Sequence, residues 1–130
     1  MGSMVRSYER LGVTSVEQVM KSIAEGKPFK YEGVECSTTG NRLLTYHIHG
    51  IRCCVPGCTM HGQYFAVEKA IDQLNAKYHL NLYCNQNGQE VMITSDHRLP
   101  KSRGGSDGIE NRQAMCYKHN SEKGNQLKYL

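Results

Sequence analysis

The sequence predicts a small single-domain α+β protein, and three observations point to this class. The chain has 130 residues, which is the length of one domain and allows a modest hydrophobic core. Apolar residues recur at helical spacing near the N-terminus. Two later segments alternate on either side of an Asn-Gly turn, as the strands of a hairpin do. Both periodicities in one short chain favour a mixed fold with a helical N-terminal extension.

The N-terminus and the apolar runs exclude some classes of protein. Met1 to Ser3 precede a second methionine, Met4, and we interpret them as an expression scar. Arg6 does not fit the N-myristoylation pattern. No uninterrupted apolar run exceeds four residues, as in Tyr64 to Val67, which is too short for a membrane span or the core of a secretory signal. We therefore expect a cytoplasmic protein with no membrane partner.

Residues 4–50 are expected to form an N-terminal extension of helices and strands. Ser15 to Glu25 carries apolar residues at helical spacing, with Ser15 as the N-cap and Gly26 as the stop. Residues 29–34 alternate weakly and suit a strand or a hairpin. A second helix is predicted over residues 39–49.

The remaining residues, 51–130, are expected to form the core that carries the chemistry. Residues 64–77 are ambiguous, because their composition favours a helix whereas their first four residues suit a strand. Residues 79–83 and 90–94 read more clearly as two strands joined by the Asn-Gly turn at 87–88. The glycine-rich segment at 103–108 is predicted to be an ordered loop.

Positive charge is concentrated near the C-terminus. The chain has 16 Lys and Arg against 12 Asp and Glu, a formal net charge of +4. From residue 96 onward there are seven basic and four acidic residues, so most of the excess lies in the last quarter. A basic segment suits a polyanionic partner such as nucleic acid, although ordinary solvated surfaces carry similar surpluses.

The cysteine spacing indicates a zinc site. Six cysteines without a secretory signal argue against disulfides and leave the thiols available as ligands. Cys54 and Cys58 flank a Val-Pro-Gly turn, and Cys116 with His119 forms a second pair downstream. Two pairs of this kind suit tetrahedral zinc, which would have no free position for substrate and would serve folding.

The ligand set has alternatives. Cys53 can substitute for Cys54, and His61 lies close enough along the chain to compete. The same residues can also be reduced, buried cysteines and a surface histidine. Cys36 and Cys84 have no partner at ligand spacing, so we expect them in the core.

The segment from residue 91 to residue 125 carries a recognisable constellation. An Asp-His pair at a strand end is followed by a proline, a Gly-Gly pair, an asparagine and a Cys-x-x-His-Asn run, which are Asp96-His97, Pro100, Gly104-Gly105, Asn111 and Cys116 to Asn120. This arrangement resembles the signature of the HNH or ββα-metal endonucleases. The upstream cysteine pair, residues 64–68 and the hairpin before Asp96 further resemble small phage-encoded members, which act in the host cytoplasm.

The resemblance implies a zinc-stabilised, treble-clef-like ββα-metal core and a metal-dependent endonuclease that nicks or cuts DNA. It implies that His97 is the general base that activates water, and that Asp96 and Asn120 hold a catalytic Mg²⁺ or Mn²⁺. Oxygen donors suit a hard cation, and an imidazole with an ordinary pKa of about 6.5 suits proton transfer near neutral pH. Asn111 occupies the family's middle position, which holds the loop and orients the histidine.

Five basic residues near this segment are candidates for contact with DNA phosphates, and each is equally compatible with a solvated surface: Lys101, Arg103, Arg112, Lys118 and Lys123.

Two other functions stay open. The protein can be a catalytically silent, zinc-stabilised nucleic-acid-binding module, or a structural zinc protein that acts through protein contacts. The sequence is compatible with a monomer or a homodimer.

Overall fold

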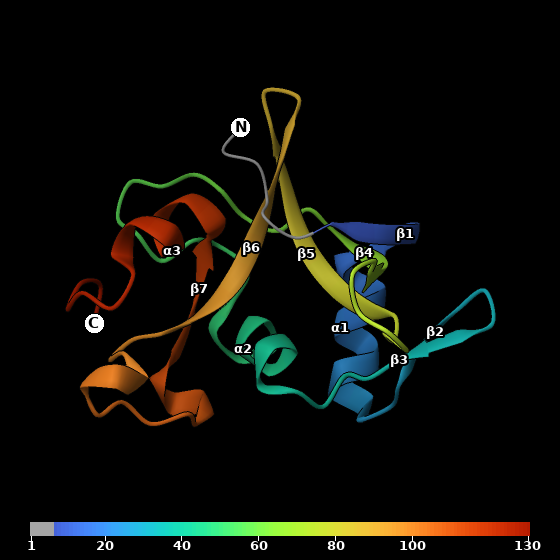
Figure 1. Cartoon of the computed structure of the whole chain (residues 1–130), viewed down its shortest axis with the longest axis horizontal. Coiled ribbons are helices and arrows are strands. Elements are labelled where there is room, and N and C mark those ends of the chain that lie inside the picture. Colours follow the sequence, from blue (N-terminus) through green and yellow to red (C-terminus); the bar gives the residue numbers. More distant parts are fainter. Residues whose placement is uncertain (1–6) are drawn as a thin grey trace.

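The computed structural model describes residues 7–130, so the predicted scar, Met4 and Arg6 lie outside the described residues. A five-stranded antiparallel sheet has the order β1-β4-β5-β6-β7, and a separate two-stranded hairpin has the order β2-β3 (Figure 1). The strands are β1 (Tyr8–Ser15), β2 (Phe29–Tyr31), β3 (Val34–Cys36), β4 (Tyr64–Ala70), β5 (His79–Gln86), β6 (Gln89–His97) and β7 (Arg112–Cys116). The helices are α1 (Val16–Glu25), α2 (Asn41–His49) and α3 (Tyr117–Lys123), with 3₁₀ turns at Lys101–Arg103 and Ile109–Asn111. The predicted mixture of helices and strands is confirmed.

The first helix begins and ends where the sequence predicts. The Ser15 side chain accepts a hydrogen bond from the backbone N–H of Gln18 at 3.2 Å, which satisfies one of the free donors of the first turn. Gly26 ends the helix with a positive φ of 69°, a conformation that favours glycine. Val19 and Ile23, one turn apart, are the buried face of this helix.

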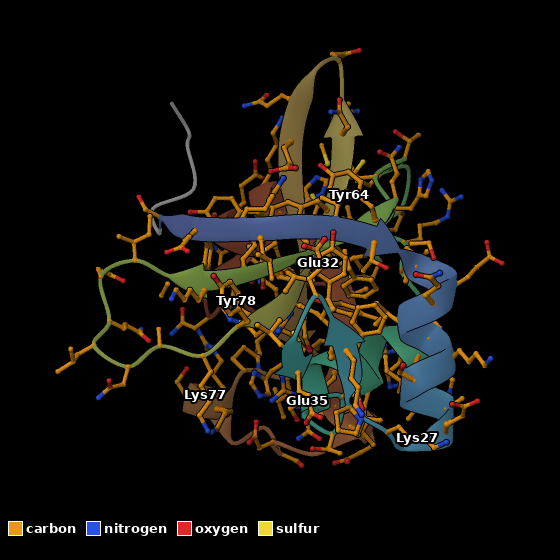
Figure 2. All side chains as sticks on the ribbon, turned by 90° about the vertical axis from the view of Figure 1, so that its right-hand side faces the viewer. Lys27, Glu32, Glu35, Tyr64, Lys77 and Tyr78 are labelled. Carbon is orange, nitrogen blue, oxygen red and sulfur yellow. The ribbon has the colours of Figure 1, made fainter. Side chains whose placement is uncertain are left out.

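Strand β1 is an element that the sequence analysis missed. It pairs antiparallel with β4 from Tyr8 to Ser15, and it leads directly into α1 (Figure 2). Its register shifts between Arg10 and Gly12, so the two-residue alternation that marks a strand is interrupted in the sequence. The sheet consequently crosses the boundary predicted between residues 50 and 51.

Arg10 ties this edge strand to the rest of the sheet. Its Nε donates to Oε2 of Glu68 at 2.7 Å, and its two terminal nitrogens donate to the Glu90 carboxylate at 2.8 and 3.0 Å. Glu68 is almost completely buried and also accepts from the Tyr83 hydroxyl at 2.6 Å and from Asn81 at 2.8 Å. Every partner of the buried carboxylate is therefore polar and well placed, as burial of a charge requires.

The predicted β5–β6 hairpin is confirmed, and β4 resolves the ambiguous segment in favour of a strand. At its turn both Asn87 and Gly88 have positive φ angles, 54° and 80°. This is the geometry for which an Asn-Gly pair is suited. The core lies on one face of the sheet, where Phe65 and Leu82 pair across β4 and β5.

Helix α2 packs against β7 and β6, and α3 packs against β6 and β7, so the last two strands carry helices from both halves of the chain (Figure 1). The Tyr46 hydroxyl on α2 donates to the backbone oxygen of Ile93 at 2.8 Å. Cys36 and Cys84 are buried among apolar residues, as predicted. Within residues 7–130, no helix combines the length and the apolar character needed to span a membrane.

Candidate metal sites and active site

Three cysteines and a histidine converge between the loop before β4 and the start of α3. The ligand atoms of Cys53, Cys58, Cys116 and His119 all lie within 4.8 Å of one another. His119 Nδ1 is 3.3 Å from Sγ of Cys116 and 3.6 Å from Sγ of Cys53. Ligands around tetrahedral zinc are separated by about 3.5–3.8 Å, as Zn–S and Zn–N bond lengths require. The donor set and its spacing therefore fit a zinc ion.

The structure places Cys53 in this cluster, where the sequence analysis preferred Cys54. The Cys53 N–H donates to Met60 O and the Cys54 N–H donates to Ala114 O, both at 2.9 Å, so adjacent residues bond to different segments. The Cys53 side chain is buried and belongs to the cluster, whereas Cys54 does not belong to it. Burial raises the pKa of the Cys54 thiol to about 11. The predicted ligand Cys54 is therefore replaced by Cys53, which the sequence had left as the alternative.

His61 does not join the cluster. Its Nδ1 lies 3.3 Å from the backbone oxygen of Thr59, and its backbone forms an isolated bridge with Arg52. Cys58, Cys116 and His119, the other three predicted ligands, are brought together. Burial raises the pKa of Cys116 to about 12, so this thiol is neutral at physiological pH in the absence of a cation.

Asp96 lies near the end of β6 and faces α3. Its Oδ2 accepts from Lys123 Nζ at 2.6 Å and from the Gln113 side chain at 3.0 Å. Lys123 also donates to the backbone oxygens of His97 at 2.6 Å and of Arg98 at 3.1 Å. These contacts commit one carboxylate oxygen within the protein and leave Oδ1 as the atom that Asp96 can offer to a cation.

Lys123 is fully buried, with 0% of its surface exposed. All three of its N–H donors have partners inside the chain. This placement corrects the prediction that Lys123 contacts DNA phosphate, because the ammonium group cannot reach the surface. Lys123 therefore forms a buried ion pair with Asp96 and is not part of a basic surface.

Asn120 lies one helical turn before Lys123 on the same face of α3. Its Nδ2 donates to Oγ1 of Thr94 at 2.7 Å, and Thr94 in turn donates to the Met115 backbone oxygen. Thr94 and Asp96 share a face of β6 because strand side chains alternate. Asn120 and Asp96 therefore extend from facing elements, and Oδ1 of the amide is the atom left for a cation.

His97 points away from Asp96, as the alternation of a strand requires. Its Nε2 lies 2.7 Å from Oδ1 of Asp107, and a quarter of its side chain is exposed. The same Asp107 oxygen accepts from Nη2 of Arg112 at 2.8 Å. The hydrogen bond from His97, followed by that from Arg112, lowers the pKa of the Asp107 carboxyl below its ordinary value.

Asp107 is a candidate functional residue that sequence reasoning missed. It lies in the glycine-rich segment that was predicted only to be an ordered loop, and no local motif marks it. Its partner His97 is ten residues away. The signal available in the sequence was an acidic residue within the loop that joins two recognised motif positions.

Asn111 holds this loop together. Its Oδ1 accepts from the Leu99 N–H at 2.9 Å, and its Nδ2 donates to the backbone oxygens of Leu99 and Ser106 at 2.9 and 2.7 Å. A Cβ atom at Gly105 would lie 1.8 Å from the Leu99 oxygen, so only glycine fits there. These contacts agree with a loop-holding role for Asn111.

The other basic candidates differ in how they are placed. Lys101 and Lys118 are exposed. Arg103 is exposed and donates through Nε to the Asn125 backbone oxygen at 2.8 Å. Arg112 turns inward, where it bonds Asp107 and donates through Nη1 to Ser95 at 3.1 Å.

These features define a small α+β protein in which an Asp-His pair ends a strand beside a cysteine-rich cluster, and a short helix supplies an amide to the same region. Residues 82–129 match the family model described as HNH endonuclease. This segment of the chain is therefore similar to the HNH endonucleases, a family of nucleases. Comparison of the chain with curated proteins and with solved structures gave no significant match.

Proposed function

We propose that the protein is a Mg²⁺- or Mn²⁺-dependent HNH endonuclease that hydrolyses phosphodiester bonds in DNA. The observation that carries the proposal is the pair of contacts between α3 and β6, in which Asn120 bonds Thr94 and Lys123 bonds Asp96. His97 is the next residue of the strand after Asp96. Asp96, His97 and Asn120 lie within the segment that matches the nuclease family.

His97 is proposed to act on the attacking water. Its ring is partly exposed at the end of β6, so solvent and a substrate phosphate can approach it. Imidazole takes up a proton near neutral pH, and a positioned general base contributes about 10²- to 10⁴-fold to a rate. Asn111 supports this role from a distance by holding the loop that follows His97.

Asp96 and Asn120 are proposed to hold the catalytic cation. Each offers one oxygen after its hydrogen bonds within the protein are made, and oxygen donors are those that Mg²⁺ prefers. When bound, the cation would stabilise negative charge on the phosphate and on the leaving oxygen. The hydrogen bonds from Lys123 and Gln113 hold the carboxylate in place for that purpose.

A second, structural metal is proposed at Cys53, Cys58, Cys116 and His119. Four protein ligands close a tetrahedral zinc site, so this ion would join the loop before β4 to the start of α3 and take no part in hydrolysis. Asn120 directly follows His119, so the same site would fix the helix that carries a proposed catalytic ligand. The exposed Lys101, Arg103 and Lys118 are proposed phosphate contacts.

Nicking of supercoiled plasmid in Mg²⁺ and in EDTA tests the proposal. The protein is expected to convert the plasmid to open-circle or linear form only with the metal. His97→Ala should abolish cleavage, and His47→Ala is the matched control because His47 is exposed on α2. Salt-dependent DNA binding without cleavage by the parental protein would instead favour the silent binding module.

A further inference from the structure

The Asp107–His97 pair is the feature of the active-site region that the proposed function does not use. Asp107 extends from the loop between β6 and β7, and its Oδ1 lies 2.7 Å from Nε2 of His97. A carboxylate can only accept a hydrogen bond, so the neutral ring must carry its hydrogen on Nε2. The lone pair of the neutral ring then lies on Nδ1.

Asp107 is itself held on several sides. Arg112 on β7 donates to the same carboxylate oxygen at 2.8 Å. Asn41 at the start of α2 donates through Nδ2 to the Asp107 backbone oxygen at 3.0 Å. The next loop residue, Gly108, donates its N–H to the side chain of Ser106, and Ser106 is bonded in turn by Asn111. The carboxylate therefore has a defined position although its side chain is 57% exposed.

Arg112 is oriented by the acceptors around it. Its Nη1 donates to the Ser95 hydroxyl at 3.1 Å while Nη2 bonds Asp107. Within the described residues, Arg112 Nε is the one buried side-chain polar atom without a hydrogen-bond partner. An unpaired buried donor costs free energy. The Arg112 guanidinium therefore keeps its hydrogen bonds to Asp107 and Ser95 although its Nε is left without a partner.

We infer that Asp107 is a positioning residue for His97, which fixes the orientation and the neutral tautomer of the imidazole and so makes Nδ1 the atom that takes the proton from water. The assignment of Nδ1 to the reaction rests on the proposed nuclease function. The assignment of the tautomer rests on the geometry alone. A hydrogen bond to one ring nitrogen fixes the ring, so the other nitrogen points in one direction. The histidine then spends less time in orientations that cannot take a proton from the water.

The tautomer is tested by two-bond ¹H–¹⁵N NMR spectra of His97 at about pH 8, well above the ordinary histidine pKa of about 6.5. The wild-type ring is expected to show the Nε2–H form, and Asp107→Ala should shift it toward a mixture of both tautomers. Asp72→Ala is the control, because it removes the same charge from the exposed connection between β4 and β5. An unchanged His97 spectrum in Asp107→Ala would overturn the inference.

The kinetic consequence is measured on the same variants with a plasmid substrate. Asp107→Ala is expected to lower kcat by about 10- to 100-fold, the range for removing a group that orients an active-site histidine, with KM little changed. Asp107→Asn keeps an acceptor oxygen and should retain more activity than alanine. A kcat within twofold of wild type in Asp107→Ala would overturn the role in the reaction. If the wild-type protein cuts nothing, the proposed function fails while the ring spectrum still decides the positioning role.

Discussion

The ammonium nitrogen of Lys123 lies 2.6 Å from Oδ2 of Asp96, and both side chains are buried. The pair joins α3 to β6 at the point where the strand carries its Asp-His motif. Both charges have left water, so each depends on the other for compensation, and removal of either one leaves an uncompensated charge in the interior. The pair therefore couples the stability of the fold to the geometry of the candidate active site.

Lys123→Met is expected to lower the free energy of unfolding by about 3–5 kcal/mol, because the methionine fills the space but leaves Asp96 charged and buried. Urea denaturation followed by circular dichroism measures the change. Lys128→Met is the matched control, since Lys128 is exposed near the C-terminus and should change stability by less than about 0.5 kcal/mol. Equal stability of the two variants would contradict the contribution assigned to the buried pair.

Substitution of two adjacent cysteines distinguishes the ligand sets. Cys53→Ser should lower the bound zinc per chain and the melting temperature together, because the cluster contains Cys53. Cys54→Ser should leave the zinc content unchanged. Metal analysis of the purified variants and thermal melts with and without a chelator provide the measurements. Loss of zinc in Cys54→Ser with retention in Cys53→Ser would restore the original prediction from sequence.

Arg10 is expected to make stability depend on pH through Glu90. Burial raises the pKa of Glu90, but hydrogen bonds from Arg10 and Tyr64 lower this pKa by a larger amount. The pKa of Glu90 in the folded protein is therefore below the ordinary 4.5. A depressed carboxyl pKa contributes stability above the unfolded-state pKa, and this contribution is lost as the pH falls through the folded-state pKa. Glu90→Gln removes the titrating carboxyl while Arg10 keeps its bond to Glu68, so the stability gap between wild type and variant should widen as the pH rises from about 3 to 6.

The expected gap from this interaction is about 1 kcal/mol near neutral pH, a small value because Glu90 is one-third exposed and solvent screens the pair. Chemical denaturation at several pH values measures it. Glu35→Gln provides the control, since the Lys30–Glu35 pair is exposed and its loss should give a small difference with little pH dependence. A gap that narrows with rising pH would contradict the sign derived for Glu90.

Gly105→Ala tests the loop that Asn111 holds. The added methyl group would meet the Leu99 backbone oxygen, which cannot move without breaking its hydrogen bond to Asn111. We expect a loss of about 1–3 kcal/mol, typical of overpacking, and faster amide exchange in the loop. Gly40→Ala meets no atom within 4 Å and serves as the control. Equal exchange rates in the two variants would show that the loop accommodates the methyl group.

The sequence predicted the local elements better than their assembly. Helix α1 and the β5–β6 hairpin depend on caps and turns that are written in neighbouring residues, such as Ser15 and the Asn87-Gly88 pair. Strand β1 was missed because its residues pair with residues of β4 that lie about 50–60 positions later in the sequence, and because its alternation is broken at the register shift. Pairing at that distance leaves little trace in local periodicity.

The candidate site shows the same division. Motif spacing identified the residues that converge, but it could not decide which of the adjacent Cys53 and Cys54 turns inward, because that depends on which segment each backbone bonds, Met60 or Ala114. Spacing also gave Lys123 the wrong environment. A lysine near the end of an amphipathic helix is ordinarily solvated, and only the tertiary structure brings Asp96 over it.

The sheet pairing also bears on whether the matched segment, residues 82–129, can be separated from the rest of the chain. Residues 82–129 include neither β1 nor β4, and they lack Cys53, Cys58 and the α2 residue Asn41. Excised alone, this stretch would expose the edge of what remains of β5 and the apolar side chains that β4 normally covers, which is a surface prone to aggregation. Transplanting the module into another protein would therefore require nearly the whole of residues 7–130.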